Sequence, residues 1–70
     1  MKVYVIVGLY GAVIDEIEAF SNEQKADEFE RKLCEEYEIP YDPTERQKRY
    51  DEDVESPEVH QFILDVDSAQ

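Results

Sequence analysis

The side chains that most often carry out chemistry in proteins are scarce in this sequence. His60 is the single histidine, and Cys34 is the single cysteine. A lone histidine with no nucleophile and no second histidine beside it lacks the partners that a general base or a metal site requires. Cys34 is followed by Glu35 and Glu36, whose negative charges disfavour the reactive thiolate. We therefore expect both side chains to be structural.

Acidic residues alternate in one segment as they do at the start of a calcium-binding loop. The segment begins at Asp51, and Asp53 and Glu55 follow at every second position. An EF-hand loop needs glycine at its sixth position and glutamate at its twelfth, where this sequence has Ser56 and Phe62. The sequence therefore predicts no metal site, and at most a weak attraction of divalent ions to this loop.

Other motifs that support catalysis or cofactor binding lack their spacing. Gly8 and Gly11 do not have the spacing of a phosphate-binding loop. Carboxylates are so frequent that no pair stands out as an acid–base pair. Arg46, Lys48 and Arg49 form a small basic cluster, which we expect to pair with neighbouring carboxylates. The sequence predicts no catalytic residue, no cofactor and no enzymatic activity.

The net charge is the strongest global feature of the chain. Its 70 residues contain 19 acidic and 7 basic side chains, which give a net charge of −12. This charge repels phosphate backbones and anionic lipids, so we expect neither direct nucleic-acid binding nor membrane binding, while basic proteins are attracted. A chain of this length is expected to form one domain, residues 1–70.

Cysteine and apolar content bear on the compartment of the protein. One cysteine allows no intrachain disulfide, whereas small secreted domains usually contain several. No stretch has the roughly 18 apolar residues of a membrane span, and the N-terminal segment is a poor signal peptide. We expect a cytoplasmic protein.

Three strands and two helices are predicted. Residues 2–9 and 13–20 are expected to form strands joined by a turn at Gly11 and Ala12, and Asp15 and Glu16 mark either a bulge or the solvent side of the second strand. Ser21 is expected to cap a helix over residues 22–38 that ends before Pro40. A short helix is expected over residues 43–50 within the segment 41–57, and a third strand over residues 58–66.

These elements predict an α+β fold with a three-stranded antiparallel sheet and one long helix on one face. The first strand is apolar on both faces, which is typical of a central strand, so the predicted order is second, first, third. The residues expected to face the helix are Val3, Val5, Val7, Phe62, Leu64 and Val66. The residues expected on the opposite, uncovered face are Tyr4, Ile6, Ile14 and Ile63, bordered by Glu16, Glu18 and Asp65. The short helix, a second copy or a partner would cover that face.

Two segments carry a resemblance to known proteins. Residues 2–8, KVYVIVG, and residues 20–26, FSNEQKA, resemble a group of small uncharacterised bacterial and phage domains. The likeness covers about two-thirds of the chain and leaves out residues 41–58. It implies a strand–strand–helix–strand fold, but it implies no activity and no functional residues.

Two functions remain open from the sequence. The first is a non-catalytic acidic module that binds a basic protein, for which the acidic surface imitates nucleic acid. The second is a structural domain that pairs with a second copy through its uncovered sheet face, where acidity serves only solubility. The residues expected to bind a partner are Tyr4, Ile6, Glu16, Glu18, Asp51, Asp53 and Ile63.

Overall fold

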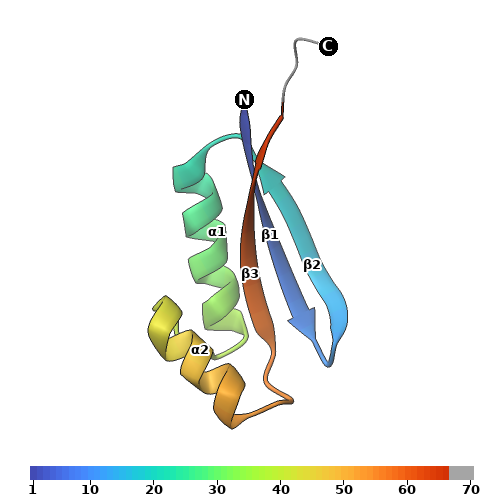
Figure 1. Ribbon diagram of the computed structural model, residues 1–70, viewed down its shortest axis with the longest axis vertical. Coiled ribbons are helices and arrows are strands. Elements are labelled where there is room, and N and C mark those ends of the chain that lie inside the picture. Colours follow the sequence, from blue (N-terminus) through green and yellow to red (C-terminus); the bar gives the residue numbers. More distant parts are fainter. Residues whose placement is uncertain (67–70) are drawn as a thin grey trace.

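The computed structural model describes residues 1–66 and has the predicted α+β architecture (Figure 1). The elements in chain order are β1 (Lys2–Tyr10), β2 (Val13–Phe20), α1 (Glu23–Glu36), α2 (Pro43–Glu52) and β3 (Glu58–Asp65). Both helices lie on one side of the sheet, and no element of residues 1–66 covers the other side. Neither helix is long and apolar enough to cross a membrane.

The sheet has the predicted strand order β2-β1-β3, and both pairings are antiparallel. β1 is central because it is apolar on both faces, whereas each neighbouring strand has one free edge. Tyr4 of β1 lies opposite Phe20 of β2 and Ile63 of β3. These pairs fix which side chains share a face, because residues that lie directly opposite each other in a sheet point to the same side.

The β1–β2 hairpin contains a tight turn and a bulge. Gly11 and Ala12 both have positive φ angles, 63° and 66°, which match the two-residue turn that suits the twist of a hairpin. The register shifts where Gly8 pairs with Glu16 but Leu9 pairs with Ile14. Asp15 is left over at this shift, so the predicted bulge is confirmed.

Helix α1 begins one residue later than its predicted cap. The sequence predicts Ser21 as the N-cap, but Asn22 has this role, because its Oδ1 accepts a hydrogen bond from the Lys25 amide at 3.1 Å. At the other end, Glu38 adopts a positive φ of 57°, and its amide donates to the Glu35 carbonyl. Ile39 donates to the Cys34 carbonyl, so the last carbonyls of α1 are satisfied.

Helix α2 follows the predicted cap at Asp42. The Asp42 carboxylate accepts hydrogen bonds from the amides of Thr44 and Glu45, and Pro43 occupies the first helical position. The helix extends to Glu52, two residues beyond the predicted end. It does not cover the uncovered face of the sheet, because it packs beside α1.

The core lies between α1 and the sheet. Its fully buried apolar residues are Ile6, Ala26, Leu33, Cys34, Ile39 and Val59. Gly8 allows the close approach of α1, because a Cβ at this position would lie 2.8 Å from a Leu33 methyl carbon and 2.6 Å from the Tyr37 hydroxyl. On the helix side of this core, Leu33 is almost completely buried, and Phe29 is half-buried against Phe20.

The predicted assignment of the two sheet faces is wrong for β1 and β3, whereas Ile14 of β2 lies on the uncovered face as predicted. Ile6 is fully buried and Tyr4 packs against the core, so both lie beneath α1 rather than on the uncovered face. Phe62 pairs with Val5, and Leu64 pairs with Val3, on the uncovered face rather than under the helix. Alternate residues of each strand point to opposite faces of the sheet, so β1 offers two apolar faces to the helix. Helix α1 packs on the face that contains Gly8, because the missing side chain leaves room for Leu33 and Tyr37.

Candidate functional site

The face of the sheet that no helix covers is the main candidate site, and we call it the open face. The strand register and the alternation of side chains assign its residues. They are Val3, Val5, Val7 and Leu9 of β1, Ile14, Ile17 and Ala19 of β2, and Glu58, His60, Phe62 and Leu64 of β3.

The large apolar side chains of the open face are exposed to solvent. The exposed fractions are 59% for Ile14, 59% for Ile17, 53% for Phe62 and 51% for Leu64. An antiparallel sheet with one face in water usually carries polar residues on that face. Contiguous apolar surface of more than a few hundred Å² on a small protein is typical of an interaction site.

Strand β2 has its polarity inverted relative to the core. Glu16 and Glu18 lie opposite Gly8 and Ile6, which places these acidic residues on the side of the sheet that carries the helices. Ile17, opposite Val7, lies on the open face. Of the eight residues of β2, only Phe20 is even half-buried. The apolar side of β2 therefore contributes nothing to the core of the single chain.

One end of the open face is polar. His60 lies 2.9 Å from the Glu58 carboxylate, measured from Nε2 to Oε1. The imidazole ring lies between the rings of Tyr50 and Phe62, with centroid distances of 5.9 and 6.3 Å. No serine, threonine or cysteine shares this face, so a nucleophile for His60 to activate is missing from the described open face.

The structure does not bring together the four acidic residues predicted to bind a partner. Glu16 and Glu18 lie on β2, at one edge of the sheet, whereas Asp51 belongs to α2, beyond the opposite edge (Figure 1). Asp51 accepts a hydrogen bond from Gln47, and Asp53 accepts one from the Glu55 amide. These two carboxylates thus have local structural roles.

The remaining predicted partner-binding residue, Ile63, occupies neither the core nor the open face. It lies opposite Tyr4, on the side of the sheet that carries the helices, yet 57% of its surface is exposed. Ile63 is on edge strand β3, so α1 leaves it partly uncovered.

The hydroxyl of Tyr37 binds a carboxylate that lies outside the predicted set. This hydroxyl donates a hydrogen bond to Asp15 at 2.7 Å, and Tyr10 packs edge-on against the Tyr37 ring. Burial, followed by the hydrogen bond and the charge of Asp15, raises the pKa of Tyr37 well above its ordinary value. The hydrogen bond fixes the bulge of β2 to the C-terminal end of α1, which is a structural role.

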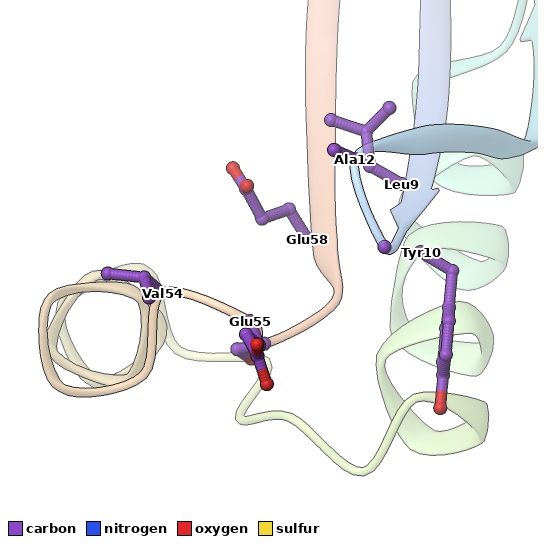
Figure 2. A pocket seen from close by; sticks show the side chains of 8 residues that line it. Leu9, Tyr10, Ala12, Val54, Glu55 and Glu58 are labelled. Atoms are coloured by element: carbon purple, nitrogen blue, oxygen red, sulfur yellow. The ribbon is translucent and has the colours of Figure 1, made fainter.

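A shallow pocket lies between the β1–β2 turn and the loop before β3 (Figure 2). Its titratable carboxylates are Glu55 and Glu58, and Figure 2 shows them pointing in different directions. Leu9, Ala12 and Val54 supply apolar surface. Two carboxylates that do not converge provide neither an acid–base pair nor a set of metal ligands, and residues 1–66 contain no group of three or more side chains suited to a metal ion.

A buried polar cluster joins the two helices. Arg46 of α2 donates hydrogen bonds to the Glu30 carboxylate at 2.8 Å and to the Cys34 sulfur at 3.0 Å. Burial raises the pKa of the Cys34 thiol, and the hydrogen bond from Arg46 opposes that rise only in part. The thiol therefore remains protonated and buried at neutral pH, which makes it unreactive.

A second groove runs beside this cluster, between α1, α2 and β3. Its buried polar groups already have partners, because Arg46 binds Glu30 and the Tyr50 hydroxyl binds the backbone of Val59. The groove therefore offers few free donors or acceptors to a ligand.

Comparison with known proteins adds no functional assignment. No protein-family model, curated protein or solved structure matches this chain.

Sequence reasoning missed the residues that make the open face apolar, above all Ile17, Phe62 and Leu64. One signal could have found Ile17. The spacing of Ile14 and Ile17 places them on one face only if a bulge intervenes, and the bulge expected at Asp15 would have done so. Glu16 and Glu18 then fall on the helix side, which is the opposite of the usual pattern.

Proposed function

We propose that this protein is a non-catalytic protein-binding module that binds through its open face. The inverted polarity of β2 carries the proposal. Ile17 points away from the core, whereas Glu16 and Glu18 point to the side of the helices. Such a strand is stabilised only when another apolar surface covers its outer side.

The energetic argument for a cover is direct. Complete burial of an isoleucine, leucine or phenylalanine side chain contributes about 1.5–3 kcal/mol relative to full exposure. Ile14, Ile17, Phe62 and Leu64 each expose more than half of their surface in the single chain. A protein partner that covered them would recover a large part of this free energy, whereas phosphate, sugar or metal ligands would not.

A photo-cross-linking residue tests the proposed function. A benzophenone amino acid would replace Phe62 on the open face and, as a control, Lys32 on the exposed surface of α1. Irradiation of cells that express each variant should join the chain to a protein through position 62 and not through position 32. No product at position 62, or equal products at both positions, would contradict the proposed function.

The distribution of charge favours a second candidate function, the binding of a basic protein. Apart from Glu58, no acidic residue of the described strands lies on the open face, so the negative charge is concentrated on the helix side. Electrostatic attraction of a basic surface would weaken steeply with salt.

The reversal of Glu16, Glu18, Asp51 and Asp53 to lysine tests this candidate. All four side chains are exposed, and the hydrogen bonds of Asp51 and Asp53 are local surface contacts, so the fold should persist while binding to a basic host protein at low salt is lost. If that binding is insensitive to salt or survives the four reversals, the candidate is wrong.

A further inference from the structure

We propose that the occupant of the open face is a second copy of this chain, with the two sheets stacked face to face. This inference rests on the proposed function, because it names the partner of the same surface. Stacked sheets keep their strand directions within about 30° of each other and interleave their side chains. The two-fold arrangement would place all four helices on the outside and close the assembly at two chains.

The size of the open face suits a dimer. Strands of eight or nine residues at about 3.3 Å per residue, set about 4.8 Å apart, give a projected area of roughly 400 Å². Protruding side chains make the accessible area larger than this projection. The projection is about half of the roughly 800 Å² that each partner contributes to a stable protein interface, and the exposed side chains of the open face add to it.

The net charge of −12 does not oppose this arrangement, because of where the charge lies. Both helices and the acidic residues of β2 lie on the far side of each sheet from the interface. Sheets stack about 10 Å apart, and the acidic side chains lie beyond each sheet, so the two acidic layers are roughly 20 Å or more apart. This separation exceeds the Debye length of about 8 Å at physiological ionic strength, so salt screens the repulsion.

The one carboxylate among the described residues of the open face has a polar partner in the same chain. Glu58 and His60 contact each other at 2.9 Å near one end of the face. Both side chains are about 40% exposed, so they lie at the rim of the apolar surface. An interface with an apolar centre and a polar rim is the usual arrangement in protein complexes.

The sheet edges are less suited to pairing than the face. The Tyr50 hydroxyl accepts a hydrogen bond from the Val59 amide at 3.0 Å and donates one to the Val59 carbonyl at 3.3 Å. The edge of β3 is therefore occupied at this residue. The edge of β2 is interrupted by the bulge at Asp15, and bulges hinder the addition of a strand.

Sedimentation equilibrium of the purified chain tests the proposal from about 1 to about 500 µM. The expected mass is twice the 8.3 kDa of one chain. Ile17→Lys should raise the dissociation constant at least about 100-fold, because it places a charge in the apolar surface that the second copy would cover. The same variant lowers the net negative charge, so repulsion between copies cannot explain the loss. Glu28→Gln on α1 changes the charge equally and should leave the dimer intact.

A second variant, Phe62→Gln, guards against a local effect of Ile17→Lys. Both side chains are more than half exposed in one chain, so circular dichroism should show folded variants. If either variant unfolds, the test uses the chain with the benzophenone residue at position 62 instead. Irradiation of this pure protein should give a cross-linked product of twice the monomer mass. A monomeric parent chain at the highest concentration overturns the proposal, and so does a dimer that both substitutions leave intact.

The outcomes separate this inference from the proposed function. A pure chain that stays monomeric but cross-links to a different protein through position 62 overturns the second copy and leaves the protein-binding function standing. A chain that neither dimerises nor cross-links overturns both. A dimer that dissociates on Ile17→Lys supports both.

Discussion

Arg46 of α2 and Glu30 of α1 form a buried ion pair, with a distance of 2.8 Å between Nη2 and Oε2. Their side chains are only 11% and 7% exposed. The second guanidinium nitrogen donates to the sulfur of Cys34, so Arg46 binds two residues of α1 that lie one turn apart. This cluster fixes α2 against α1, although α2 has few apolar residues of its own.

We expect Arg46→Ala to lower the free energy of unfolding by about 3–5 kcal/mol, because it leaves the Glu30 carboxylate buried without a partner. Urea denaturation measures this change. Lys48→Ala, at an exposed position of the same helix, should change it by less than about 0.5 kcal/mol. The double variant Arg46→Met with Glu30→Met should recover most of the loss, since no buried charge remains. Equal losses for Arg46→Ala and Lys48→Ala would contradict the role of the pair.

Gly8→Ala tests the close approach of α1 to β1. The added methyl group would meet Leu33 and the Tyr37 hydroxyl at less than 3.0 Å, so we expect a loss of about 1–3 kcal/mol. Tyr37→Phe alone should lower the free energy of unfolding by about 1 kcal/mol, because it removes the hydrogen bond to Asp15. The double variant should lose less than the sum of the two single losses, because the hydroxyl that meets the methyl group is gone. Additive losses, measured by thermal or urea denaturation, would argue against the contact.

Glu38→Gly should stabilise the protein by about 1 kcal/mol. Glu38 follows the end of α1 with a φ of 57°, a conformation that costs side-chain-bearing residues about 1–2 kcal/mol and glycine little. Glu36→Gly, within the last turn of α1, is the matched control and should destabilise the protein by about 1 kcal/mol. Changes of the same sign in both variants would show that backbone conformation is not the cause.

The free energy of unfolding should fall as pH rises above about 8. Burial raises the pKa of Cys34 above its ordinary value of 9.0, so the folded chain holds this proton more tightly than the unfolded chain does. A raised pKa contributes stability below the unfolded value, and this contribution is lost as pH rises toward the folded value. The pKa values of Tyr37 and Tyr50 are also raised, chiefly by burial, which extends the fall to higher pH.

Urea denaturation between about pH 8 and pH 11 measures this dependence. Cys34→Ala should flatten the part of the curve below about pH 9, where the tyrosines scarcely ionise in the unfolded chain. A steep fall that is unchanged in Cys34→Ala would assign the effect to other groups.

Strand order was predictable from the sequence, whereas the assignment of faces was not. The segment from Val3 to Leu9 is apolar at nearly every position, so its two faces are both apolar. Such a strand is typical of the middle of a sheet, independently of the order of the other strands. Ile6 and Val7 are equally apolar neighbours on opposite faces, so hydrophobicity alone cannot tell which one meets the helix. The structure decides through Gly8, because the helix packs where a side chain is missing.

Local hydrogen bonds limited the prediction at the helix ends. Ser21 and Asn22 are both good capping residues, and a difference of one residue in backbone conformation selects Asn22. The pattern around Asp42 was decisive because a proline followed it at the first helical position. The pairing of Arg46 with a carboxylate could be expected from the sequence, but its choice of Glu30 depends on the packing of two helices that no local pattern encodes.

The hydroxyl of Tyr50 has a consequence for how the protein can grow into larger structures. Any strand added along β3 must displace this hydroxyl from Val59 or stop short of it. Tyr50 thus shortens the free edge of β3 along which another strand can pair, and this matters in a small protein whose sheet has an uncovered apolar face.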